Sequence, residues 1–178
     1  MGRRGSSLLQ TNMGLRRYKT LSNSTGNFAL PALRRRQPTE GDGYMIVARD
    51  LLQGVEALST LPPNVHPRSC ALIAAHALEC ALKAFLWHKG KKKEIRGRDV
   101  QHDLVALWNM AHKEDLSIPR DPPDWATVLS SGHGPNFYFR YQKGQGGTVV
   151  NGGQTPALIP MMDALKNLIE MVGLAVKG

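Results

Sequence analysis

The segment from Pro67 to Lys89 constrains the fold more than any other, because it is apolar in nearly every helical direction. Proline is favoured in the first turn of a helix and glycine just after its end, so Pro67 and Gly90 mark the limits of one long helix. The longest continuous apolar runs, such as Cys70 to Ala75, fall far short of the roughly 20 residues that cross a bilayer. We therefore predict a buried central helix and no transmembrane segment.

One narrow polar line interrupts this helix. His76, Glu79 and Lys83 are spaced by three and four residues, which places them on one face. Polar groups on a buried helix need partners. Two interpretations stay open: the line forms a structural network with His102 or Arg140 from neighbouring elements, or it lines a cleft for an anionic ligand.

Four further helices are predicted from apolar residues at helical spacing and from their end signals. The fold class expected is all-α, an up-and-down bundle of four to five helices, with a Gly-rich loop or short hairpin between Gly132 and Gly153, before the last helix. The further helices are expected from Asp42 to the prolines at 62 and 63, after an N-cap at Asp99, after Asp121, and from Thr155 onward.

The positive charge is concentrated before the first predicted helix. The chain carries +9 overall, and seven of these charges fall within residues 1–40. We predict a disordered basic tail over residues 1–41 and one helical domain over 42–178. The tail has the composition of a transit peptide or a nucleic-acid arm, but a cloning remnant or an upstream start codon is the favoured explanation.

The two cysteines and the lack of a secretory pattern indicate a cytoplasmic protein. Cys70 and Cys80 lie ten residues apart in one predicted helix, too far to form a disulfide. Catalytic signatures are also missing: no paired cysteines, no histidine pair flanking a glutamate, no P-loop and no Gly-x-Ser-x-Gly sequence occur. We therefore expect no metal and no cofactor.

Three short segments occur in an order that resembles the HEPN family. The first runs from His76 through Glu79 to Leu82-Lys83-Ala84, the second is His102-Asp103-Leu104, and the third is Phe139-Arg140-Tyr141. HEPN proteins have an Arg-Tyr-Pro motif at the third position, where this chain has Gln142 in place of the proline. The resemblance covers roughly residues 44–176.

The resemblance implies a homodimer connected with nucleotide or RNA chemistry. Some HEPN members are metal-independent ribonucleases that use an arginine and a histidine four to six residues apart, and Arg96 and His102 fit that spacing. His102 would transfer a proton while Arg96 or Arg98 neutralised the phosphorane. Other members are non-catalytic and bind ligands or pair with a nucleotidyltransferase. Among this chain's residues, Arg140 beside Tyr141 is a further candidate for binding an anion.

The leading hypothesis is a non-catalytic HEPN-like domain that binds nucleotide, RNA or a partner protein. Its ligand-binding candidates are His76, Glu79, Lys83, Arg140 and Tyr141. The first alternative is a metal-independent endoribonuclease of a toxin or defence system, with Arg96, Arg98 and His102 as catalytic candidates. The second is a structural interaction domain.

Overall fold

The computed structural model describes residues 37–62, 66–134 and 158–177. Within these ranges the chain forms α-helices, one short 3-10 helix and no strand, so the predicted all-α bundle is confirmed. The elements are α1 (Glu40–Ser59), α2 (Pro67–His88), η1 (Glu94–Arg96), α3 (Leu104–Lys113), α4 (Asp124–His133) and α5 (Leu158–Ala175).

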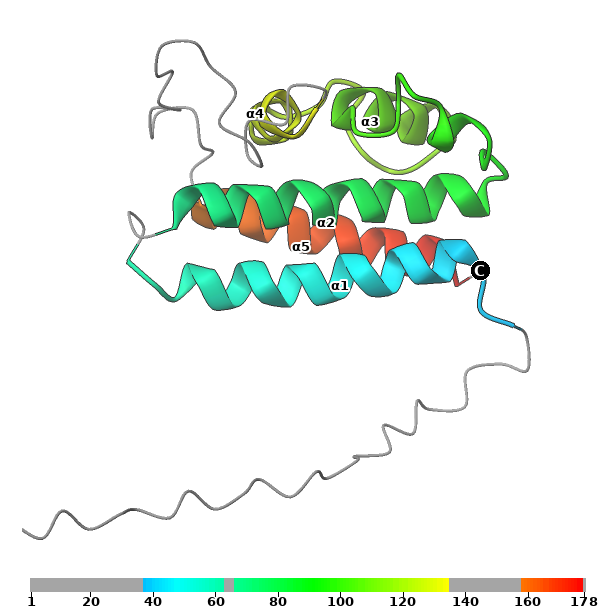
Figure 1. Cartoon of the computed structure of the whole chain (residues 1–178). Helices are drawn as coiled ribbons and strands as arrows, with labels where there is room; N and C mark the ends of the chain where they lie inside the picture. Colours follow the sequence, from blue (N-terminus) through cyan, green and yellow to red (C-terminus); the bar gives the residue numbers. More distant parts are fainter. Residues whose placement is uncertain (1–36, 63–65, 135–157, 178) are drawn as a thin grey trace, which may run out of the picture. The chain divides into compact units, whose positions relative to one another are not determined.

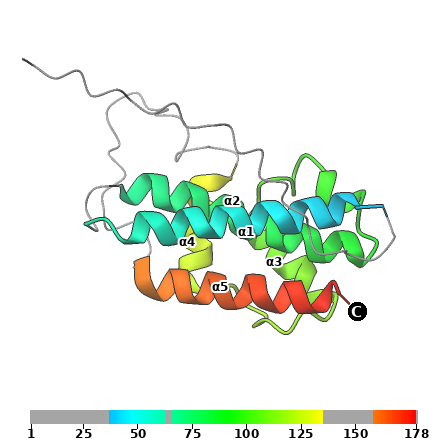
Figure 2. The same cartoon turned by 90° about the horizontal axis from the view of Figure 1, so that it is seen from below.

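Helix α2 lies at the centre of the bundle. Figure 1 shows α1 and α5 along one side of α2, and the short helices α3 and α4 on its opposite side. Helix α1 runs antiparallel to α2, whereas α3 and α4 lie across the long helices, as the view from below also shows (Figure 2). Because α2 contacts all four other α-helices, it connects the two sides of the domain.

The burial of α2 confirms its prediction as the central helix. Leu78, Leu82 and Leu86 are completely buried, and every residue from Ala77 to Leu86 is buried. By length and composition alone α2 is also apolar enough to cross a membrane. In this fold, however, 78% of its most apolar stretch is buried by the rest of the domain.

The domain begins earlier than the predicted boundary at Asp42. Helix α1 starts at Glu40, and Thr39 is its N-cap. The Thr39 hydroxyl accepts a hydrogen bond from the Asp42 backbone N–H at 3.2 Å, and the Asp42 carboxylate accepts one from the Thr39 N–H at 2.7 Å. This reciprocal capping box stabilises the helix end at Thr39, so α1 begins two residues before the predicted helix start at Asp42. The rest of the predicted tail, residues 1–36, lies outside the described residues.

The predicted N-cap of the third helix is wrong by four residues. Asp103, not Asp99, caps α3, and its carboxylate accepts a hydrogen bond from the Ala106 N–H at 3.0 Å. Both aspartates are capable caps. The apolar stripe that packs on the core, however, begins only at Leu104, so tertiary packing selects Asp103. His102 consequently lies in the turn before α3 rather than within its first turn.

The last helix, α5, packs on the core through apolar residues at helical spacing. Leu165, Ile169 and Val172 are buried against the α1 and α2 side of the core. The proposed start at Thr155 and the predicted loop or hairpin fall mainly in residues 135–157, which lie outside the described residues.

Replacing either of two glycines near the start of α1 by alanine should change the free energy of unfolding, but in opposite directions. A Cβ on Gly41 would lie 2.7 Å from the Trp87 ring, whereas a Cβ on Gly43 would meet nothing within 4 Å. We expect Gly41→Ala to lower the free energy of unfolding by about 1–3 kcal/mol through overpacking. Gly43→Ala should raise it by about 0.5–1 kcal/mol, because alanine is the better helix former. Urea unfolding of both variants tests this; equal effects would contradict the packing of α1 on Trp87.

Candidate functional site: a buried glutamate contacted by a lysine and two histidines

The Glu79 side chain is the centre of a buried polar cluster. Its Oε1 accepts a hydrogen bond from Lys83 Nζ at 2.6 Å. Its Oε2 lies 2.5 Å from His133 Nε2 and 3.2 Å from His102 Nδ1. We call Glu79, Lys83, His102 and His133 the Glu79 cluster. Three of the four side chains are almost fully buried, and only His102, at 28% exposure, reaches the surface.

The members come from three separate parts of the bundle. Glu79 and Lys83 are one turn apart on α2. The Glu79 carboxylate contacts residues on the α3 and α4 side, whereas Lys83 Nζ also lies 6.0 Å from the centre of the Tyr44 ring on α1. His102 lies in the turn that leads into α3, and His133 lies in the last turn of α4. The contacts of α2 with α3 and α4 therefore bring together residues that are 23 and 54 positions apart.

The cluster keeps Glu79 ionised. Burial alone raises the pKa of a carboxyl group, because it disfavours the charged form. Here that effect is outweighed by hydrogen bonds from His133 and Lys83, the positive charge of Lys83 and a hydrogen bond from His102, which together lower the pKa of Glu79 to about 2. The neighbouring Cys80 thiol is also buried, and the Lys83 charge only partly offsets the effect of this burial. Burial, and next the Glu79 charge, raise the pKa of Cys80 to about 12, so this thiol is not a nucleophile.

Several predicted site residues meet here. His76, Glu79 and Lys83 share one face of α2, and the His76 ring centroid lies 6.2 Å from that of His133. The polar line contacts His102, one of the two partners that the structural-network interpretation allowed. Arg140 and Tyr141 lie outside the described residues, and so does the predicted link from the polar line to Arg140.

His133 is the member that the sequence analysis missed. The segment from Gly132 onward was predicted to be a loop, but α4 continues through His133. The signal that was present is its spacing: Ala126, Leu129 and His133 follow one another at three and four residues, which places His133 on the buried face of the same helix.

The structure places Arg96 and His102 in different ion pairs. Arg96 ends η1, and its guanidinium bonds the carboxylate of Glu40 on α1. Hydrogen bonds from Tyr44 and then Arg96 lower the pKa of Glu40. His102 contacts Glu79 on α2 instead, and Arg98 is exposed in the turn between η1 and α3.

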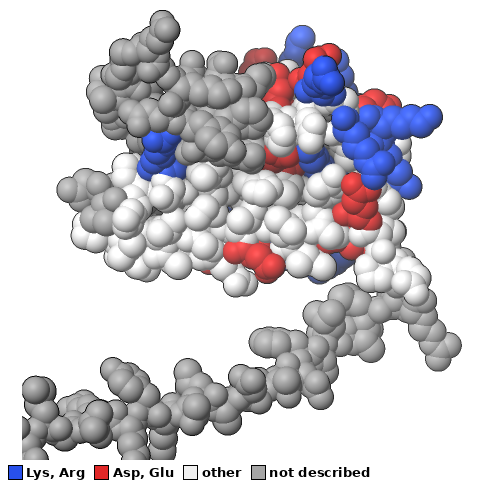
Figure 3. Space-filling view, viewed as in Figure 1, with Lys and Arg blue, Asp and Glu red and all other residues white. Residues whose placement is uncertain are grey.

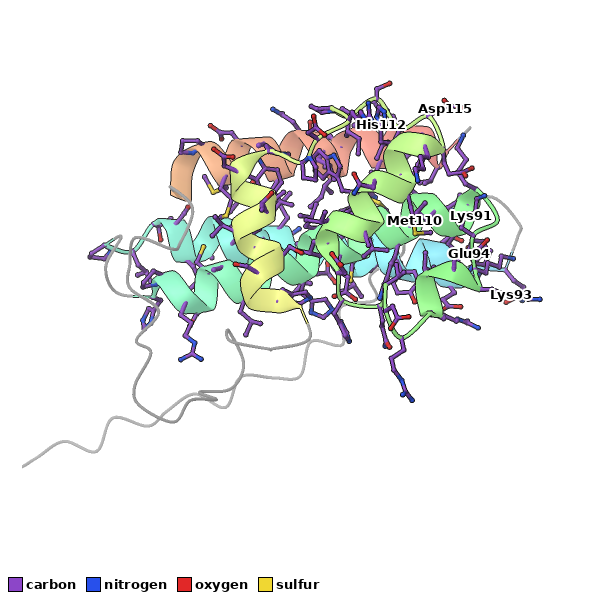
Figure 4. The ribbon with its side chains drawn as sticks, turned by 90° about the horizontal axis from the view of Figure 1, so that it is seen from above. Lys91, Lys93, Glu94, Met110, His112 and Asp115 are labelled. Atoms are coloured by element: carbon purple, nitrogen blue, oxygen red, sulfur yellow. The ribbon has the colours of Figure 1, made fainter. Side chains whose placement is uncertain are left out.

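The residues after α2 form an exposed basic segment, which we define as residues 89–98. Figure 3 shows lysine and arginine side chains gathered at this end of the domain, and Figure 4 shows Lys93 at its outer edge. The buried side chain of Ile95 holds the segment against the core. Its basic residues are Lys89, Lys91, Lys92, Lys93, Arg96 and Arg98.

Some of these cations are engaged within the domain. Lys91 bonds Glu114 at 2.8 Å, and Arg96 bonds Glu40. Lys89 Nζ and Lys92 Nζ lie 5.4 Å and 4.0 Å from the centres of the Phe85 and Trp87 rings. Lys93 and Arg98 form no ion pair among the residues that the structure describes. Two exposed cations therefore remain available for an external anion.

Comparison of the chain with known proteins adds no relative. No family model matches it, and neither a curated protein nor a solved structure does. Its possible chemistry therefore follows from two features of its own: a buried carboxylate contacted by two imidazoles, and a basic segment at one end of the bundle.

Proposed function

We propose that this domain binds RNA through its basic segment and does not cleave it. The observation that supports this is the exposure of Lys93 and Arg98 on a short segment that carries only one acidic residue before Asp99, Glu94. Nucleic-acid backbones are recognised chiefly by lysine and arginine contacts to phosphates, which require cations free of internal partners. A polyanion also suits two available cations five positions apart, Lys93 and Arg98, better than a single small phosphate ligand does.

Arg98 is used for RNA binding in this proposal, and the arrangement of the other two catalytic candidates, Arg96 and His102, favours binding over cleavage. A ribonuclease of the expected type needs a histidine that moves a proton and an arginine that faces the same phosphate. Here Arg96 is paired with Glu40, and His102 Nδ1 is directed at Glu79. Each side chain therefore has a structural partner on a different helix.

Reversing the two available cations tests RNA binding. In the full-length chain, Lys93→Glu with Arg98→Glu should weaken binding of a short single-stranded RNA at least about tenfold. The slope of log affinity against log salt should fall by about 1.4, since two phosphate contacts are lost and each contributes about 0.7 on a single strand. Fluorescence anisotropy across a salt series measures both quantities.

The matched control places the same charge change elsewhere. Arg120→Glu with Lys177→Glu alters two exposed cations outside the basic segment and should change the affinity by less than about threefold. Equal losses in both double variants would show that only net charge matters, and unchanged binding in the first would refute the basic segment as the RNA site. The tail is present in every protein, so its contribution cancels.

The same assay separates binding from catalysis at His102. We expect His102→Ala to lower the free energy of unfolding by about 1–3 kcal/mol, because a buried hydrogen-bond network loses a member, while RNA affinity stays unchanged. In the ribonuclease alternative, the parent cleaves RNA in the presence of chelator. His102→Ala and Arg96→Ala would then both fold and both fail to cleave. That outcome would replace the proposed function.

Three further parts of the proposal concern assembly and location. The HEPN resemblance supports a homodimer, and the exposed apolar side chains Ile46, Val47 and Leu174 on α1 and α5 are candidate contacts.

A nucleotidyltransferase is the partner that the same resemblance suggests. The two reduced cysteines suit a cytoplasmic location. A monomer mass by light scattering would remove the dimer and leave a single-chain RNA-binding or structural interaction domain.

A further inference from the structure

The Glu79 cluster brings together three side chains of the types that bind transition metals. One carboxylate oxygen and two imidazole nitrogens, from Glu79, His102 and His133, all lie within 4.8 Å of one another. We propose that these residues form a binding site for a divalent cation of the zinc class, with Glu79 Oε2, His102 Nδ1 and His133 Nε2 as ligands. This site is independent of the basic segment and of RNA binding.

The ligand set has the chemistry that zinc prefers. Zinc sites with three protein ligands commonly combine histidines with one glutamate and keep a fourth position for water or another ligand. In this cluster the two histidine nitrogens approach the same carboxylate oxygen from different elements.

The distances require one modest adjustment. Two ligand atoms about 2.0–2.1 Å from a tetrahedral ion lie roughly 3.3 Å apart. The separation of 3.2 Å between His102 Nδ1 and Glu79 Oε2 already fits. The separation of 2.5 Å between His133 Nε2 and Glu79 Oε2 must open by roughly 0.8 Å to reach the tetrahedral value. A rotation of the His133 ring or a shift at the end of α4 would supply this opening.

The environment of the three ligands sets access and affinity. His102 is partly exposed, so an ion can enter from that side and retain water at its open position. Lys83 holds the other oxygen, Glu79 Oε1, and fixes the orientation of the carboxylate. The Lys83 charge also repels a cation, so we expect a dissociation constant on the order of micromolar rather than nanomolar.

Zinc titration of the untagged, full-length chain tests the site after treatment with chelator. Isothermal titration calorimetry should show one zinc ion per chain. Cobalt should give visible d–d bands without a thiolate charge-transfer band, because both cysteines are buried and neither is a proposed ligand. Zinc at a free concentration 100-fold above its dissociation constant should raise Tm by at least about 5 °C.

The variants assign the ligands. His102→Gln and His133→Gln should each weaken zinc binding at least about tenfold, within the range seen when a metal site loses essential support. The matched control is His112→Gln, another partly buried histidine, which bonds the Ile118 carbonyl at 3.0 Å and should bind zinc as the parent does. Lys93→Glu with Arg98→Glu should also bind zinc normally, which separates this site from the RNA site.

Three outcomes would overturn the proposal: no stoichiometric zinc binding, full binding in both His102→Gln and His133→Gln, or a loss specific to His112→Gln. If His133→Gln fails to fold, zinc binding by His102→Gln decides the test, because His102 is more exposed and its substitution disturbs the core less. Histidine-ring NMR of the parent adds a test without any substitution. Zinc must shift the His102 and His133 signals and leave that of His112 in place.

Discussion

Replacing Glu79 by glutamine should lower the free energy of unfolding by about 3–5 kcal/mol at pH 7, the usual cost of breaking a buried ion pair by removing one partner. Glutamine preserves the shape of the side chain and can still accept a hydrogen bond from Lys83. The amide nitrogen that replaces Oε2, however, is a donor and cannot accept the hydrogen bonds that His133 and His102 give to the carboxylate. Urea unfolding in the presence of chelator measures this loss without any contribution from a bound metal.

The matched control is Glu56→Gln. Glu56 is also a helical glutamate beside a lysine, but its contact with Lys166 is 3.5 Å long and both side chains are more than 40% exposed. We expect this substitution to cost less than about 1 kcal/mol, because exposed ion pairs contribute little. A similar loss of unfolding free energy in the two variants would show that the Glu79 cluster stabilises the domain no more than an ordinary surface ion pair does.

Acid should remove the contribution of Glu79 selectively. Its pKa is near 4.5 in the unfolded chain and about 2 in the folded domain, so the folded state holds the proton less tightly. Stability from this group is therefore complete above pH 4.5 and declines as the pH falls toward 2. The shift corresponds to about 3 kcal/mol in total, of which about 2 kcal/mol should be lost by pH 3.

The Glu79→Gln variant isolates this effect from the other carboxylates. Its side chain does not titrate, so its free energy of unfolding should fall less between pH 5 and pH 3 than that of the parent. The difference between the two proteins should narrow by about 2 kcal/mol over that interval. Parallel losses in parent and variant would contradict a strongly ionised Glu79 in the folded domain. Chelator is again present in every sample.

The sequence predicted the central helix and its polar line because both depend on local signals. The proline and glycine at its ends and the apolar residues between them define α2 whatever packs around it. Spacing alone placed Glu79 and Lys83 on one face. Because buried polar groups need partners, His102 was one of the two partners considered, and it does contact Glu79.

The remaining features depended on tertiary contacts. The choice of Asp103 over Asp99 as a cap follows from where the core begins, which no local rule contains. His133 belongs to the cluster only because α4 continues past Gly132 and packs on α2. The spacing between Arg96 and His102 fits the ribonuclease alternative, but Arg96 bonds Glu40, whose position in space the sequence does not reveal.

The long sequence separations within the Glu79 cluster have a consequence for the order of folding. Helices α1 and α2 are neighbours in the chain and pack along their lengths, so their contacts can form early. The contacts from Glu79 to His102 and His133 span 23 and 54 residues and require α3 and α4 to be docked. They should therefore be largely absent from the folding transition state, and loss of the Glu79 carboxylate should accelerate unfolding far more than it slows folding. The main effect of the cluster would then be to slow the unfolding of a bundle that has already formed.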